Sequence, residues 1–237
     1  MTDGDGARCV KSAVERTVYR PAHPLDLRAT VLPHQRGPAD PAMQVDAAGR
    51  IWRTALTPTG VGTIAMQQSR GEVHATAWGT GAPWLLDQLP RLCGADDDPD
   101  AFDPGSHPLI REAHRRHPGL RLSASDLLVD ALVGAILEQK VTGVQAYAGW
   151  RALLRRHGTA APGPTPRPMW AAPDAAQWSR IPSWEWHRAG VEPSQARTAV
   201  AAMRRGDSLL STLSGADAQV RLAVLTSLPG VGAWTAA

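Results

Sequence analysis

The sequence predicts an α+β protein in which an antiparallel β region is followed by a helical region. Between residues 51 and 79, short segments rich in β-forming residues are separated by glycine, proline and a polar Ser-Arg-Gly-Glu turn. From residue 128 onward, apolar residues recur at steps of three and four, which is the period of a helix buried on one face. The acidic, proline-rich segment 94–105 cannot continue either pattern and marks the boundary between the two regions.

The first two parts of the chain are expected to be a tail and a β domain. Residues 1–20 are polar and weakly patterned, so we expect a flexible tail there. The antiparallel β domain is expected to span residues 21–95. Its expected elements are three strands, the last two forming a hairpin, and one short helix, at 51–58, 62–68, 73–79 and 84–92.

The helical domain is expected to run from residue 106 to residue 237. Ser123 and Ser125 are suited to cap the first long helix. Apolar positions at helical spacing follow in two sets, Leu128, Leu132, Ala135 and Ile136, then Ala146, Trp150, Leu153 and Leu154. The polar segment 138–143 separates the sets, so two packed helices with a tight break are expected. The proline-rich linker 158–168 then leads to a third group of helices.

Composition excludes several classes of protein. Two cysteines, Cys9 and Cys93, are too few for a disulfide framework, a four-cysteine zinc site or an iron–sulfur cluster. The chain has no apolar run of membrane-spanning length and no signal-peptide pattern, so we expect a cytoplasmic monomer without a membrane partner. The formal net charge of +3 and the pI of 9.3 are compatible with nucleic-acid binding but do not require it.

The segment Leu-Pro-Gly-Val-Gly at 228–232 predicts a tight turn between two helices. Pro229 ends the first helix, and Gly230 and Gly232 allow the backbone to take positive φ. The second helix would present free backbone amides at the turn, and such amides bind anions. A turn without bulky side chains could therefore hold a DNA phosphate without reading a base. The alternative is a simple helix–helix connection.

The fuller string around this turn resembles a known DNA-binding motif. LPGVGAWTA (228–236) resembles the helix-hairpin-helix of the DNA glycosylase superfamily, and DALVGAILEQKVTGVQA (130–146) resembles its helix pair around the gap-filling loop. PGLRL (118–122), before that helix pair, and AGVEPSQARTAV (189–200), which resembles the segment before the hairpin, fall in the order of the same superfamily. The nearest branch is the 3-methyladenine DNA glycosylase II type, whose N-terminal antiparallel domain resembles half of the TATA-binding fold.

The resemblance implies a base-excision repair enzyme that acts on double-stranded damaged DNA. It would hydrolyse the N-glycosidic bond of alkylated purines and leave the strand intact. The resemblance also implies roles for particular residues. The phosphate-binding residues would be Leu228, Pro229, Gly230, Val231, Gly232 and Thr235. A monovalent cation, the sole cofactor implied, would be held by the backbone carbonyls of Thr226, Leu228 and Val231.

The resemblance places Gln139 and Lys140 where the vacated base space is filled. Gln139 can hydrogen-bond the widowed base, whereas Lys140 departs from the apolar wedge of the nearest branch and could lie over a phosphate. The alternative for both is a solvated loop tip. Trp184 and Trp186 could border the DNA or the base pocket, with packing as the favoured interpretation.

Trp234 stands where strand-cutting relatives carry a Schiff-base lysine. In the alkylation-repair branch that the sequence resembles, an aromatic residue at this place lines the base pocket, so the resemblance implies that role for Trp234. The chemistry agrees, because the indole has no nucleophilic amine and its face attracts a cationic alkylated base. A core position is the alternative.

The catalytic carboxylate of the resembled family is not expected within residues 1–237. In the resembled family an Asp follows the hairpin, but residues 233–237 contain none, so that Asp is expected beyond Ala237 and this chain alone is expected to be inactive or unstable. Glu138, Asp126 and Asp130 are the nearest carboxylates and are expected to be surface or capping residues. A non-catalytic helix-hairpin-helix DNA-binding module is the alternative function.

Overall fold

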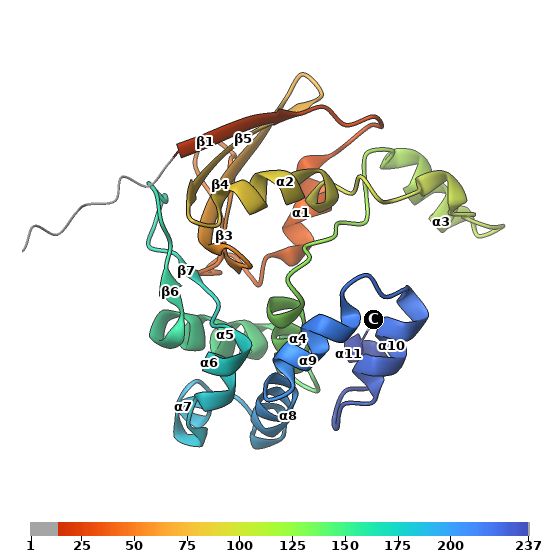
Figure 1. Ribbon diagram of the computed structural model, residues 1–237. Coiled ribbons are helices and arrows are strands. Elements are labelled where there is room, and N and C mark those ends of the chain that lie inside the picture. Colours follow the sequence, from red (N-terminus) through yellow and green to blue (C-terminus); the bar gives the residue numbers. More distant parts are fainter. Residues whose placement is uncertain (1–13, 237) are drawn as a thin grey trace, which may run out of the picture.

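The computed structural model describes residues 14–236 and confirms the predicted α+β fold (Figure 1). A five-stranded antiparallel sheet has the strand order β1-β5-β4-β3-β2. The strands are β1 (Val14–Tyr19), β2 (Met43–Val45), β3 (Ile51–Thr57), β4 (Gly60–Ser69) and β5 (Glu72–Gly79). In Figure 1 this sheet stands above a group of helices that contains the C-terminal end of the described chain.

Each face of the sheet is covered by a different part of the chain. Helix α2 (Ala82–Leu92) packs Leu85 and Leu89 into a core with strand residues such as Ile64, and α1 (Leu27–Val31) and the 3-10 helix η1 (Leu32–His34) extend this core at one end. The other face carries Trp52, stacked on Trp78 with ring centroids 5.3 Å apart. A short ribbon of β6 (Thr159–Ala160) and β7 (Trp170–Ala171) lies against β3 there.

The structure corrects the expected extent of the tail. Residues 14–19 form β1, which pairs with β5 from Val14 opposite Trp78 to Tyr19 opposite Val73. None of the six residues of this strand is fully buried, although Tyr19 packs against the core on the α2 side of the sheet, so backbone hydrogen bonds at the sheet edge are a main part of what holds the strand. That is why the strand has no clear hydrophobic pattern. The rest of the expected tail lies outside the described residues.

The segment between the sheet and the helices contains little regular structure. It includes the 3-10 helix η2 (Pro99–Ala101) and helix α3 (Pro108–Arg116). The predicted capping by Ser123 and Ser125 is wrong, because α4 (Leu128–Leu137) begins after Leu127, which makes no side-chain cap bond. Ser123 instead donates its hydroxyl to the carbonyl of Leu92, 2.6 Å away, and so ties this segment to the end of α2.

The helical region is built around one hydrophobic core. Its further helices are α5 (Gly143–His157), α6 (Ala175–Arg180), α7 (Ser183–Arg188), α8 (Pro193–Met203), α9 (Gly206–Leu213), α10 (Ala218–Thr226) and α11 (Ala233–Ala236). The break between α4 and α5 falls where the sequence predicted it. Three buried indoles, Trp150, Trp178 and Trp186, form the centre of the core, with successive ring centroids 6.1 and 5.6 Å apart. None of the described helices is both long and apolar enough to cross a bilayer.

Candidate nucleic-acid interface

The turn between α10 and α11 is anchored by its apolar residues. Leu228 is 2% exposed and Val231 is 5% exposed, and both belong to the core of the helical region. The amide of Val231 donates to the carbonyl of Leu228 at 3.0 Å, which closes the turn. Pro229, Gly230 and Gly232 stay exposed between and beside these anchors. Leu228 and Val231 therefore anchor the turn in the core, and the outer backbone of the turn stays accessible.

The two glycines of the turn have different structural roles. Gly230 has φ +83°, and a Cβ there would lie 2.4 Å from the hydroxyl oxygen of Thr198 on α8. A glycine is therefore required at position 230, because the backbone has a positive φ and because a side chain there would clash with Thr198. At Gly232 a Cβ would meet no atom within 4 Å, so this position opens to the surroundings.

Several backbone amides at the turn have no acceptor within residues 14–236. They belong to Gly230, Gly232 and Ala233, all of which are exposed. The carbonyl of Leu228 already accepts one hydrogen bond, and a carbonyl oxygen has a second lone pair for another ligand. An exposed cluster of free amides is suited to a phosphate oxygen.

Gln139, in the break between α4 and α5, is bonded directly to this turn. Its amide nitrogen donates to the carbonyl of Gly230 and to the hydroxyl of Thr235, both at 2.9 Å. Residues 91 and 96 positions apart in sequence are thereby held together. The structure thus brings two of the predicted DNA-contacting elements side by side. The amide nitrogen of Gln139 is thus occupied, whereas its side-chain oxygen accepts no hydrogen bond from the described residues.

Gln195 on α8 supports the same break from inside the protein, and sequence reasoning missed it. Its side chain is 4% exposed and donates to the carbonyls of Leu137 at 2.9 Å and Gln139 at 2.8 Å. The side-chain oxygen accepts from the amide of Glu192 at 3.1 Å. The available signal was a glutamine on the buried face of a helix, where a polar side chain needs partners.

The other predicted site residues occupy contrasting environments. Lys140 has φ +56° and is exposed at the tip of the break. Trp234 is 98% exposed, so the described residues do not bury it in a core. Trp186 is 1% exposed and donates its indole N–H to the carbonyl of Ile181, which agrees with its interpretation as a packing residue. Trp184 is 64% exposed on α7.

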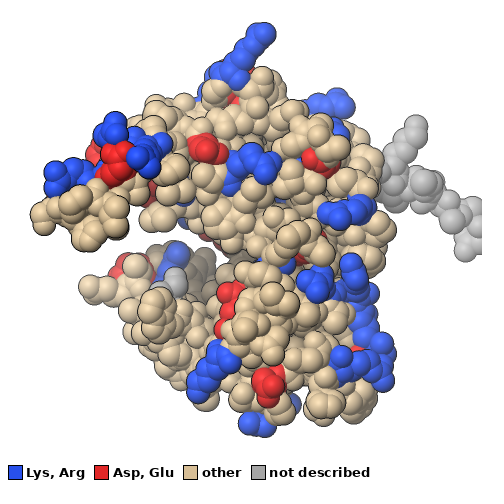
Figure 2. All heavy atoms as spheres, turned by 180° about the vertical axis from the view of Figure 1, so that it is seen from behind, with Lys and Arg blue, Asp and Glu red and all other residues tan. Residues whose placement is uncertain are grey.

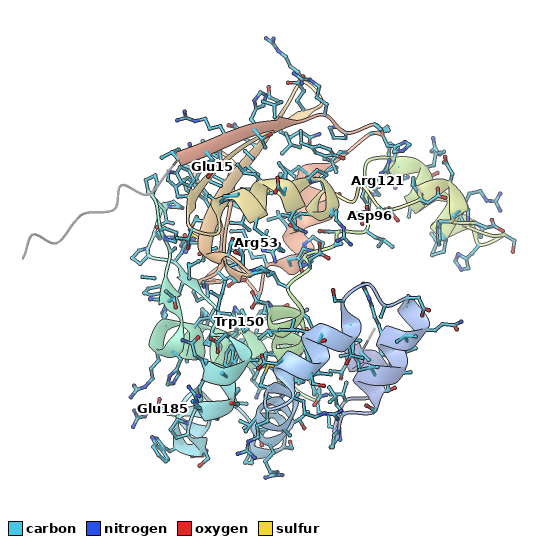
Figure 3. All side chains as sticks on the ribbon, viewed as in Figure 1. Glu15, Arg53, Asp96, Arg121, Trp150 and Glu185 are labelled. Carbon is cyan, nitrogen blue, oxygen red and sulfur yellow. The ribbon has the colours of Figure 1, made fainter. Side chains whose placement is uncertain are left out.

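A polar cavity of about 540 Å³ lies between the sheet and the helices. Figure 3 labels Arg53 on β3 and Trp150 on α5 on the two sides of this junction. The guanidinium carbon of Arg36 sits 4.3 Å from the ring centroid of Trp150, and its Nη2 donates to the carbonyl of Asp130 at 3.1 Å. Asp40 accepts from the indole N–H of Trp150 at 3.1 Å. Sequence reasoning did not find this cluster.

Burial governs the ionisation of groups around the cavity. It raises the pKa of Asp130 to about 6, although the charges of Arg53 and Arg36 oppose that shift. It also lowers the pKa of Arg53, whose Nη1 has no hydrogen-bond partner among the described residues. Burial, reinforced by Arg53 and Arg36, lowers the pKa of His34 to about 4. A neutral His34 and a readily protonated Asp130 reduce the charge held in the cavity.

The structure separates the three carboxylates that the sequence placed near the break. Asp130 lines the cavity, which corrects its expected surface or capping role. Asp126 is exposed and pairs with the Nη1 of Arg91 at 2.8 Å. The side chain of Glu138 is 47% exposed, and its Oε1 lies 3.9 Å from the Nε of Arg36. None of the three is brought to the hairpin turn by a hydrogen bond that the described residues make.

The surface around the interface is hollowed and has mixed charge. Figure 2 shows a deep notch at the edge where, in Figure 1, α3 stands above α10 and α11. Basic and acidic side chains are interspersed over this face rather than gathered in a single positive field. A phosphate at the turn would therefore depend on backbone amides more than on an extended basic patch.

Comparisons with known proteins give a likeness of fold. No protein-family model and no curated protein sequence matches the chain. Among solved structures, it is similar to the 3-methyladenine DNA-glycosylase from Archaeoglobus fulgidus, with a TM-score of 0.77, 15% identity, and coverage of 93% of this chain and 76% of that one. The 8-oxoguanine glycosylase/lyase of Clostridium acetobutylicum, in complex with double-stranded DNA, has a TM-score of 0.72 and 11% identity, and the match covers 94% of this chain and 76% of that one. MBOgg1 in complex with a DNA ligand has a TM-score of 0.71 and 15% identity, and the match covers 95% of this chain and 77% of that one.

Proposed function

We propose that this protein is a base-excision repair DNA glycosylase. The observation that carries the proposal is the pair of hydrogen bonds from Gln139 to Gly230 and Thr235. They join a turn with free amides to a loop that can enter a base stack. The fold shared with two glycosylases that were solved in complex with DNA supports the same conclusion.

The joined turn and loop fit the work that base excision requires. An enzyme that turns a base out of a duplex must offset a cost of about a few kcal/mol of stacking and pairing. A phosphate held by the amides of Gly230, Gly232 and Ala233 would fix the strand beside the loop. Gln139 would then present its oxygen to the widowed base, and Lys140, next to it, would reach a phosphate. A monovalent cation on the carbonyls of Thr226, Leu228 and Val231 would strengthen the phosphate contact.

We propose alkylated purines as the substrate class. Trp234 presents an almost fully exposed indole beside the turn. A base alkylated on a ring nitrogen carries a positive charge, and an indole face attracts a flat cation. The indole offers no amine for a Schiff base, so the reaction would be hydrolysis that leaves an intact strand with an abasic site. The carboxylate that would stabilise the sugar cation is not assigned to a described residue.

Binding and turnover are tested separately. In the first arm, fluorescence anisotropy compares duplexes with and without a tetrahydrofuran abasic-site analogue, and preferential binding of the analogue duplex is expected. In the second arm, chromatography detects bases released from methylated duplex DNA, and electrophoresis checks the strand. Base release with intact strands supports the glycosylase. Binding without release supports the alternative, a non-catalytic DNA-binding module, and absence of lesion-selective binding contradicts both.

A further inference from the structure

A second groove, remote from the turn, lies between α8 and the segment that joins α6 to α7. Its volume is about 910 Å³. One stripe of α8 lines it, with Pro193, Ala196, Val200 and Arg204 at helical spacing. A different face of α8 carries Gln195 and Thr198 towards α4 and the hairpin turn. The groove is therefore separate from the proposed DNA interface.

The floor of the groove is apolar and its edge carries an exposed aromatic ring. Ile181, Trp186 and Val191 are buried at its base, with exposures of 7%, 1% and 6%. Trp184 stands at the edge with 64% of its surface exposed. A contiguous apolar depression on a protein surface is typical of an interaction site, and tryptophan is enriched among the residues that dominate binding energy.

The charge around the groove has one sign. Arg180, Arg197 and Arg204 line it, and no Asp or Glu does. Within residues 14–236, none of these three arginines makes an ion pair or a side-chain hydrogen bond to a carboxylate. Elsewhere on the surface, exposed arginines do find carboxylates, as Arg20 does with Glu72 and Arg115 with Glu112. The groove thus has uncompensated positive charge over an apolar floor.

We propose that this groove docks an acidic helical segment of a partner protein, anchored by aliphatic side chains. Charge complementarity selects the acidic character, and the aliphatic floor selects the anchors. Arg197 and Arg204 are seven residues apart, which is two helical turns or about 10 Å. A partner helix with carboxylates at a similar spacing and apolar residues between them would satisfy both arginines at once.

A nucleic acid suits the groove less well than a peptide. Single strands bind by stacking bases on aromatic faces along a basic track. Here only Trp184 is an exposed aromatic. Trp186 is buried in the floor with 1% exposure, and the other floor residues, Ile181, Val191, Val200 and alanines, are aliphatic, so they offer no exposed stacking platform. Aliphatic side chains of a peptide would bury this floor and exclude water from it.

The test is a selection with a phage-displayed library of random 12-residue peptides on the 237-residue protein. Sequences are compared between the wild type and the double variant Trp184→Ala/Arg197→Glu, with Arg155→Glu as the matched control on an exposed face of α5 outside the groove. We expect the wild type and the control to enrich acidic peptides with spaced aliphatic residues. A synthetic consensus peptide, measured by fluorescence polarisation, should bind the double variant at least tenfold more weakly.

The altered side chains are exposed, so the double variant should keep the unfolding midpoint of the wild type, which circular dichroism checks. Equal enrichment on the wild type and the folded double variant overturns the proposal, as does enrichment of neutral or basic peptides. A fluorescein-labelled dT12 oligonucleotide is measured in parallel. Binding of that oligonucleotide that is lost in the double variant would assign the groove to single-stranded nucleic acid and also overturn the proposal.

Discussion

Replacing Gln195 by Leu should destabilise the protein by about 2–4 kcal/mol, because two carbonyl groups lose their donor. The carbonyl of Leu137 is bonded in a buried setting, and an unsatisfied buried acceptor costs about 1–3 kcal/mol. The carbonyl of Gln139 is only partly buried, so water can replace much of its bond and the cost there is about 1 kcal/mol. The loss of the bond from Glu192 adds to these costs.

Gln177→Leu provides the matched control for this prediction. Gln177 has the same place in its own helix as Gln195, since its oxygen accepts from the amide of Asp174 at 2.9 Å, but it is exposed and bonds no distant carbonyl. Its replacement should cost about 1 kcal/mol or less. Urea unfolding followed by tryptophan fluorescence measures both, and the slopes should be equal. Equal midpoints for the two variants would refute the reasoning that Gln195 holds the break between α4 and α5.

Three further predictions concern the turn, the cavity and the chemistry. Gly232→Ala should leave the unfolding midpoint unchanged yet weaken binding to all duplex sequences alike. Gly230→Ala should lower the unfolding midpoint, because residue 230 has a positive φ and a side chain there would meet Thr198. A Gly232→Ala variant that binds DNA normally would contradict the phosphate contact. Because the pKa of Asp130 is raised to about 6 in the folded protein, folding takes up a proton between roughly pH 4 and 6. The unfolding free energy relative to that of Asp130→Asn should therefore fall as pH rises through that window, by about 3 kcal/mol for a shift of roughly two pKa units. The same pH dependence of the unfolding free energy in both proteins would contradict the buried carboxyl. Borohydride trapping on methylated duplex DNA should give no covalent protein–DNA adduct. An adduct that disappears in Lys140→Ala would show a Schiff base on that lysine and would contradict the hydrolytic mechanism.

Elements specified by local pattern were predictable. The α4–α5 pair follows from apolar spacing, and the hairpin turn follows from Leu-Pro-Gly-Val-Gly, in which anchors and glycines alternate within a few residues. Strand β1 was not predictable, because it is held by backbone bonds to β5 and shows little side-chain burial.

The polar contacts could not be derived from local patterns. Arg36 reaches the carbonyl of Asp130 across 94 positions of sequence, and Gln195 reaches Leu137 across 58. Each residue taken alone resembles an ordinary surface side chain. Only tertiary packing gives these side chains partners away from water: the packing of the sheet on the helices for Arg36, and that of α8 on α4 for Gln195. Their roles therefore become visible once the tertiary fold is known.

The bonds from Gln139 to Gly230 and Thr235 also have a consequence for motion. Opening the hairpin breaks contacts of the α4–α5 break, and opening the break frees the hairpin, so the two should open as one cooperative unit. In hydrogen exchange, protected amides at the end of α4 and the end of α10 should then share one opening free energy. A surface assembled in this way loses little conformational freedom when a ligand arrives, and more of its contact energy remains available for affinity.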